Sequence, residues 1–133
     1  MITIEQYFAG YPELKTDDFI KNASLLLNRV NLLLEDAQKY GVMLTVNTKT
    51  GCLISGSKNG GIRPKDCPEG SALSSHKTAQ GVDIYDPSNA LDGWLDDIKL
   101  LKYDLYRESA ESTPSWLHVT TRPPKSSRRT FKP

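Results

Sequence analysis

The feature that most constrains the fold is a run of helically spaced apolar residues between Phe19 and Tyr40. Apolar side chains recur there every three or four residues, which is the period of one face of an α-helix. Thr16 or Asp17 can cap the start of this helix, and Gly41 can adopt the left-handed conformation that ends it. The sequence therefore predicts one long structural helix, with apolar positions Phe19, Ala23, Leu26, Leu27, Val30, Leu33, Leu34 and Ala37.

The segment after this helix has the features of a β-hairpin followed by a loop. Residues 42–46 and 52–55 are short runs with β-branched side chains, and the polar residues 47–51 between them favour a turn. Residues 56–70 then contain four glycines and two prolines. This composition disfavours regular structure, so we expect a long surface loop, and loops of that length in small domains often carry function.

The C-terminal half predicts two strands separated by a second helix. Residues 81–85 and 116–121 alternate in polarity, which is the pattern of a half-buried strand. Residues 89–103 have a helical period, with Pro87 and Ser88 at the entry. Helices and strands in this order predict an α+β domain. The residues that the second helix is expected to bury are Leu91, Trp94, Leu95, Ile98 and Leu101.

Length and composition indicate one folded domain over residues 1–133. This length is enough for a single core, and contents of 38% hydrophobic and 25% charged residues are typical of soluble proteins rather than disordered chains. No apolar stretch approaches the roughly 20 residues that span a bilayer. The N-terminus lacks the basic and apolar segments of a signal peptide, so none is expected. Without a secretion signal, Cys52 and Cys67 are predicted to be free thiols, with a disulfide as the alternative.

The net charge of +1 hides a basic C-terminal tail, residues 122–133, which contains five basic residues and no acidic one. Such a tail can bind an anionic polymer, either cell-wall material or nucleic acid. It can equally pack over the domain surface or touch a neighbouring subunit. Nothing else in the sequence matches a nucleic-acid-binding module, so we do not expect nucleic acid as a partner.

Both histidines of the chain lie where strands could direct them into a metal site. His76 precedes Asp83 by seven residues, and His118 lies on the later strand. Asp83 and His118 each stand between two apolar residues, a pattern that anchors the backbone in the core and points the polar side chain the other way. Two imidazoles and one carboxylate suit Zn²⁺, with the fourth tetrahedral position left for water in a catalytic site. The alternative is a pair of partly buried histidines with ordinary hydrogen bonds.

Two segments around these residues resemble a known family. Residues 74–83, SSHKTAQGVD, resemble the S-x-H-x-x-G-x-A-x-D motif of the zinc D-Ala-D-Ala carboxypeptidase and endopeptidase family, which shares its fold with the Hedgehog signalling domain. Residues 116–118, WLH, resemble its W-x-H motif, and residues 22–33 and 122–133 are similar to small phage-encoded members. The resemblance implies a small antiparallel sheet packed with helices. It also implies a Zn²⁺ ion bound by His76, Asp83 and His118.

The chain departs from the family pattern at three places. Ala79 and Gly81 stand where the family has Gly and then Ala, an exchange of small residues. The family's substrate-binding or oxyanion-stabilising arginine follows an S-G pair closely, whereas the first arginine after Ser55 and Gly56 is Arg63. Arg63 is therefore the candidate for that role, and a solvated loop arginine is the alternative.

The third departure concerns the general base. Family members generally carry Glu or Asp three residues before the final histidine, and here that residue is Ser115, whose hydroxyl cannot act as a base at neutral pH. Glu108 and Glu111 lie upstream, and Glu108 resembles the glutamate of phage-type members. We predict Glu108 as the base, with two solvated loop acids as the alternative. Trp116 is expected either to line a substrate groove or to pack in the core.

The resemblance implies a metallopeptidase that hydrolyses a peptide bond in bacterial peptidoglycan, as an endolysin or a virion component of phage or prophage origin. Delivery from the host cytoplasm would then depend on a holin or on the virion. The alternative is a weak or inactive structural or wall-binding virion protein with the same fold, which Ser115 favours. The sequence does not predict which peptidoglycan bond is cut.

Overall fold

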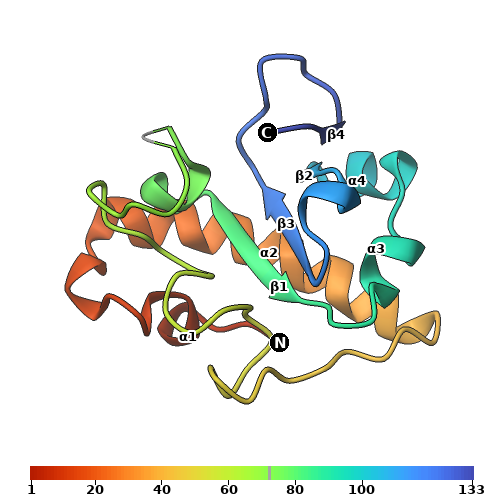
Figure 1. Ribbon diagram of the computed structural model, residues 1–133, viewed down its shortest axis with the longest axis horizontal. Helices are drawn as coiled ribbons and strands as arrows, with labels where there is room; N and C mark the ends of the chain where they lie inside the picture. Colours follow the sequence, from red (N-terminus) through yellow and green to blue (C-terminus); the bar gives the residue numbers. More distant parts are fainter. Residues whose placement is uncertain (72) are drawn as a thin grey trace.

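The computed structural model describes residues 1–71 and 73–133 and places a four-stranded sheet against one long helix (Figure 1). This helix is α2, Asp17–Lys39, which confirms the helix predicted from the apolar period. The Thr16 side chain caps it by accepting a hydrogen bond from the backbone N–H of Phe19. Gly41 follows its end with a φ of +90°. Every predicted apolar position is buried except Phe19, which is half-buried.

The sheet has the strand order β1-β3-β2-β4. Its strands are β1 (Gly81–Tyr85), β2 (Tyr106–Glu108), β3 (Trp116–Thr120) and β4 (Thr130–Phe131). The other elements are α1 (Ile4–Phe8), α3 (Ala90–Trp94), α4 (Asp97–Tyr103) and the 3-10 turns η1 (Pro12–Leu14), η2 (Ser75–Thr78) and η3 (Ala110–Ser112). The α+β class and the strands at 81–85 and near 116–121 are confirmed.

The expectation of an all-antiparallel sheet is wrong in one pairing. β3 runs antiparallel to both β1 and β2, but β4 runs parallel to β2. After β3 the chain turns back through residues 121–129, so the basic tail returns as an edge strand (Figure 1). The tail is therefore part of the folded sheet.

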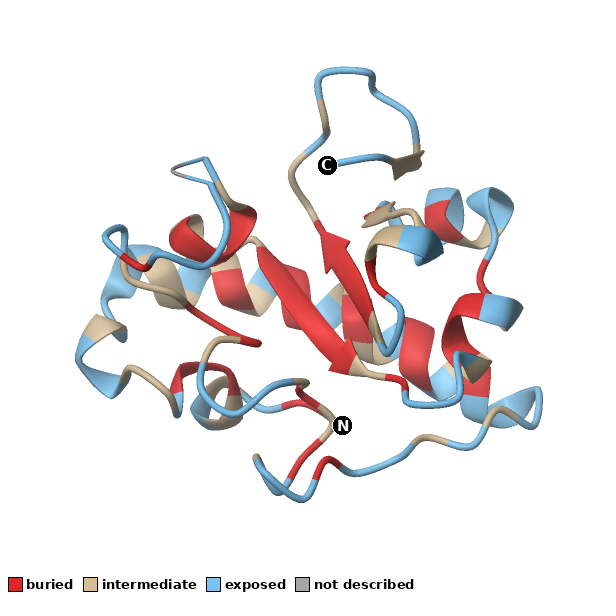
Figure 2. Cartoon of the chain, in the orientation of Figure 1, coloured by how far each residue is buried: buried red, intermediate tan, exposed pale blue. Residues whose placement is uncertain are grey.

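The two faces of the β1 and β3 pair have different roles. Val82 and Ile84 on β1 and Leu117 and Val119 on β3 are fully buried in the core that α2 covers. Figure 2 shows both strands as buried along their length. Because side chains alternate along a strand, Asp83 and the residues that share its face point away from this core.

The predicted helix over residues 89–103 is divided into α3 and α4. Leu95 has an extended backbone, and the Asp96 side chain caps α4 instead of continuing α3. The break changes the phase of the second half, so Ile98 and Leu101 are 80% and 63% exposed and their predicted burial is wrong. The prediction holds for α3, where Leu91 and Leu95 are buried and Trp94 is half-buried. In α4 the buried residues are Leu100 and Tyr103.

The hairpin predicted for residues 42–46 and 52–55 does not form a ladder. A single bridge closes the turn, and Ile54 instead forms an isolated bridge to Ile84 of β1. The side-chain amide of Asn47 donates a hydrogen bond to the Ile54 carbonyl, at 3.0 Å, and so occupies an acceptor that a hairpin would use. Side chain to backbone bonds of this kind compete with strand pairing.

Residues 56–70 form neither helix nor strand, as predicted, but they are not all at the surface. Gly60, Gly61 and Ile62 are buried. The Gly60 carbonyl accepts a hydrogen bond from the Asp83 backbone N–H, at 2.8 Å, so the loop passes directly beside β1. A Cβ on Gly61 would lie 2.2 Å from the Tyr7 carbonyl oxygen, and this close approach requires glycine.

Cys52 and Cys67 are free thiols, as predicted. Among the described residues, no helix combines the length and apolar character needed to cross a membrane.

Candidate metal centre

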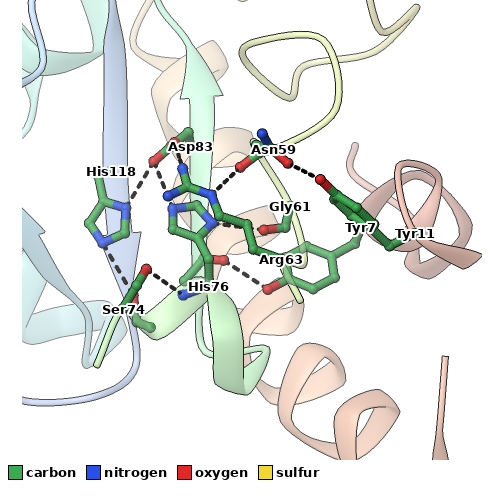
Figure 3. Close-up of polar contacts among 11 residues, drawn as sticks. Tyr7, Tyr11, Asn59, Gly61, Arg63, Ser74, His76, Asp83 and His118 are labelled. Carbon is green, nitrogen blue, oxygen red and sulfur yellow. Dashed lines mark hydrogen bonds and ion pairs between the residues drawn. The ribbon is translucent and has the colours of Figure 1, made fainter. Parts of the chain in front are cut away.

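Three elements bring the predicted ligands together. Asp83 and His118 face each other across the antiparallel pairing of β1 and β3. His76 lies on the short turn η2, which leads directly into β1. In Figure 3 the three side chains converge, and their candidate ligand atoms all lie within 4.8 Å of one another. The sequence prediction that these residues meet is confirmed.

Ala79 and Gly81 stand where the family motif has Gly and then Ala, and the structure explains only the glycine at position 81. Ala79 ends η2 with a φ of +60°, a left-handed conformation that glycine adopts more easily. Gly81 is required by space, because a Cβ there would lie 2.2 Å from Ser75 Oγ and 3.1 Å from His118 Cε1. Gly81 therefore leaves room for a contact between Ser75 and His118.

Both imidazoles are held from outside the cluster. His76 Nδ1 donates to the Gly61 carbonyl oxygen at 2.7 Å, and His118 Nε2 lies 3.3 Å from Ser75 Oγ. The inner nitrogens, His76 Nε2 and His118 Nδ1, lie 3.2 and 2.9 Å from Asp83 Oδ1. Orientation of a metal-binding histidine through its outer nitrogen is the usual arrangement in metal sites.

The contact to Gly61 determines the protonation of His76. A carbonyl oxygen can only accept, so the proton of a neutral His76 is on Nδ1, and Nε2 presents a lone pair. That lone pair faces a carboxylate oxygen of Asp83, which is also an acceptor. Two facing acceptors repel each other unless a cation, either a proton or a metal ion, lies between them.

The spacing fits a metal ion. With bonds of 2.0–2.1 Å, two ligand atoms of tetrahedral zinc lie about 3.3 Å apart. The nitrogen to oxygen distances of 3.2 and 2.9 Å approach that value. All three residues are at least nine-tenths buried. His76, Asp83 and His118 could therefore hold a metal ion.

Asp83 is ionised and is supported by Arg63. In the metal-free protein, with a proton between His76 and Asp83, burial raises the pKa of the Asp83 carboxyl, but the charge of His76 and the hydrogen bonds from His118 and His76 outweigh burial, so the pKa lies well below its usual value. Arg63 Nη2 donates to Asp83 Oδ2 at 3.1 Å, which leaves Oδ1 for the histidine side. Arg63 Nε donates to the Asn59 carbonyl at 2.7 Å. Arg63 is therefore not a solvated loop residue.

The cluster forms part of the wall of an open groove of about 1380 Å³. Glu108 and Trp116 also line this groove. The pairing of β2 with β3 matches Tyr106 to Thr120 and ends at Arg107 with Val119. Because side chains alternate along a strand, Glu108 lies on the sheet face that also carries Thr120 and His118. Of the two acids proposed for the base, only Glu108 lines the groove that contains the cluster.

The other residues of that region lie elsewhere. Glu111 forms an ion pair with Lys132, at 3.1 Å, and lines a separate depression beside Asp92. Ser115 is exposed, and its carbonyl accepts a hydrogen bond from the Asp86 backbone N–H. The position at which the family has its base is thus an exposed serine outside the residues that line the groove.

Sequence reasoning missed the supporting residues. Ser75 and Gly61 orient the histidines, and the Tyr7 hydroxyl donates to the Gly81 carbonyl at 2.8 Å. Burial and the nearby charge of Asp83 raise the pKa of Tyr7, so its hydroxyl remains a neutral donor. Tyr7 lies 74 residues from Gly81, and no local pattern predicts such a contact.

Comparisons with protein-family models, curated proteins and solved structures found no match to this chain.

Proposed function

We propose that the chain is a zinc-dependent peptidase that hydrolyses a peptide bond in bacterial peptidoglycan. The observation that carries the proposal is the inward-facing His76 Nε2, Asp83 Oδ1 and His118 Nδ1 beside an open groove. Two histidines and one carboxylate are a donor set of catalytic zinc sites. The choice of peptidoglycan rests on the resemblance of residues 74–83 and 116–118 to the carboxypeptidase and endopeptidase motifs.

Zinc held by these residues would polarise the scissile carbonyl and lower the pKa of a water molecule to about 7. Glu108 is the residue proposed to take the proton from the attacking water and to return it to the leaving amine. Its place on the groove wall, on the sheet face that also carries His118, supports this role. Arg63 holds Asp83 and, from the groove wall, is proposed to stabilise the negative charge that develops on the carbonyl oxygen.

The second candidate function is a structural or wall-binding virion component of low or no activity. Ser115 favours it, because this exposed serine replaces the acid of the family pattern. The two functions differ in one outcome, since the second predicts metal or wall binding without release of new amino groups from peptidoglycan.

The test measures zinc content and amine release from purified peptidoglycan for wild type, Glu108→Ala and His118→Ala. We expect Glu108→Ala to retain zinc and lose at least about 100-fold in rate, in line with general acid–base catalysis, whereas His118→Ala loses both. Glu111→Ala is the matched control, because Glu111 is an exposed acid near Glu108 in the sequence that does not itself line the groove.

Zinc binding without cleavage by wild type would favour the structural function. Cleavage that survives complete chelation, or a folded protein that takes up no zinc, would contradict the peptidase mechanism.

A further inference from the structure

Four of the five cations of the C-terminal tail line the groove, namely Arg122, Lys125, Arg128 and Lys132, and they differ in whether they have internal partners. Arg129 lies over the Tyr106 ring and donates to Asp104 and to the Leu105 carbonyl. Arg122 donates to the Leu73 carbonyl, and Lys132 pairs with Glu111. These three cations stabilise the fold of the tail.

Lys125 and Arg128 differ from them. Both are exposed and line the groove, and neither side chain has a hydrogen-bonding or ion-pair partner among residues 1–71 and 73–133. They belong to residues 123–128, which we call the arch and which can be followed in Figure 1 between β3 and β4. Two cations without internal partners thus lie at the wall of the groove that contains His76, Asp83 and His118.

The arch holds these two residues in a defined turn. Pro123 and Pro124 fix their own φ angles, and the Ser127 N–H donates to the Pro124 carbonyl at 3.0 Å. Ser127 has a φ of +59°, and the Arg128 N–H donates to Ser126 Oγ at 3.3 Å. Preorganisation of this kind reduces the entropy lost on binding.

Both ends of the arch are anchored to the sheet. β3 leads into it, and on the far side β4 pairs with β2, where the Arg107 N–H donates to the Arg129 carbonyl at 2.8 Å. Thr130 Oγ1 donates to Asp97 Oδ1 at 2.6 Å. The arch is therefore joined to the sheet at both ends.

We propose that Lys125 and Arg128 form a carboxylate-binding subsite that selects peptides with a free carboxylate near the bond to be cut. The inference rests on the proposed peptidase function, whose substrate class it narrows. Arginine and lysine form charge-assisted hydrogen bonds to carboxylates, and Arg can bind both oxygens. Arg122 and Lys132 also line the groove, but both already have internal partners, which leaves two unpartnered tail cations there; an anionic polymer would require a longer line of them.

The test compares two synthetic stem peptides, L-Ala-γ-D-Glu-L-Lys-D-Ala-D-Ala with free carboxylates and the same peptide fully amidated. Calorimetry measures both dissociation constants on zinc-loaded Glu108→Gln protein, which keeps the metal ligands and separates binding from cleavage. The test protein adds Lys125→Gln and Arg128→Gln. The matched control adds Lys21→Gln and Lys39→Gln, which remove the same charge from exposed positions on α2.

We expect the free peptide to bind about 10-fold more tightly than the amidated one, from one net charge-assisted interaction. The arch variant should lose this preference, and the control should keep it. Equal dissociation constants for the two peptides, a preference that persists in the arch variant, or no binding of either peptide would overturn the subsite.

Loss of binding to teichoic acid by the arch variant, with the peptide preference unchanged, would also overturn it and assign the arch to a polymer. Failure of the proposed function gives a different result, because it appears as absent cleavage by wild type whatever the two dissociation constants are.

Discussion

Arg63 supports the cluster of His76, Asp83 and His118 through a single carboxylate oxygen of Asp83. It donates to Asp83 Oδ2, while Oδ1 faces both histidines, so the two oxygens of one carboxylate have separate roles. The Arg63 side chain is only 11% exposed, so its loss would leave a buried, partly unpaired oxygen. Residues that hold a metal ligand in this way affect metal affinity strongly.

Replacement of Arg63 with Met is therefore expected to weaken zinc binding by about 10- to 100-fold. Competition with a chromogenic chelator measures the zinc dissociation constant. Arg29→Met is the control, because Arg29 makes a comparable pair with Asp104 at the surface. An unchanged zinc affinity in Arg63→Met would show that the Asp83 contact has no role in metal binding.

The raised pKa of Asp92 predicts that the free energy of unfolding depends on pH, independently of the site formed by His76, Asp83 and His118. Burial raises its pKa to about 6, although the Arg107 guanidinium acts in the opposite direction. Its Oδ2 is buried and has no hydrogen-bond partner among the described residues. Because the folded pKa exceeds the ordinary value of 3.8, the stability from Asp92 is full below pH 4 and is lost as the pH rises through about 6.

Asp92→Asn remains neutral and should therefore be more stable than wild type at pH 8, by up to roughly 3 kcal/mol. The difference should be much smaller near pH 4, where Asp92 is protonated in the folded state and close to half protonated in the unfolded state. Urea unfolding of the metal-free proteins at the two pH values measures it. A difference between the proteins that is the same at pH 4 and pH 8 would contradict the assignment.

The convergence of Asp83 and His118 could be predicted from sequence because the strands that carry them alternate clearly. Val82 and Ile84 fix the face of Asp83, and the neighbours of His118 do the same for β3. The support from Ser75 could not be predicted, since it depends on a contact with a residue 43 positions away. Arg63 contacts Asp83 and Glu108 lines the same groove, and their catalytic roles stay predictions.

At the scale of elements, the break between α3 and α4 depends on Asp96. Its Oδ1 accepts a hydrogen bond from the Lys99 N–H at 2.9 Å, and its Oδ2 accepts one from Lys99 Nζ. The apolar period of residues 89–103 continues across this point, which is why it predicted one helix. A capping aspartate after Leu95 is a local signal that competes with that period.

Asp96→Ala removes this cap and should lower the free energy of unfolding by about 1 kcal/mol. Urea denaturation measures the change. Glu35→Ala, at an exposed position of α2, should remain within about 0.5 kcal/mol of wild type. Equal stability of the two variants would indicate that α4 begins without help from Asp96.

The pairing of β4 with β2 could not be predicted either, for a physical reason that differs from the helix break. Thr130 and Phe131 form a strand of two residues, too short for an alternation pattern. Their pairing with Arg107 and Glu108 joins segments more than twenty residues apart. Long-range pairings depend on the whole fold rather than on local sequence.

At the scale of the whole molecule, a metal ion would connect η2, β1 and β3. Because a ligand that binds only the folded state stabilises it, zinc at 100 times its dissociation constant should add about 2.7 kcal/mol. Differential scanning calorimetry should then show a rise in Tm of several degrees for wild type and none for His118→Ala. Calcium should have no such effect, since it prefers oxygen ligands. An unchanged wild-type Tm with zinc would contradict the metal assignment.

The parallel pairing of β4 with β2 also connects the two proposed functional parts of the groove, the arch and Glu108. Phe131 pairs with Glu108, and the Ser109 N–H donates to the Phe131 carbonyl at 2.8 Å. The chain that leaves the arch is therefore attached to the strand that presents the proposed base. A displacement of the arch away from the groove would therefore also change the orientation of the Glu108 carboxylate. Substrate selection and proton transfer in this protein would then share one mechanical linkage.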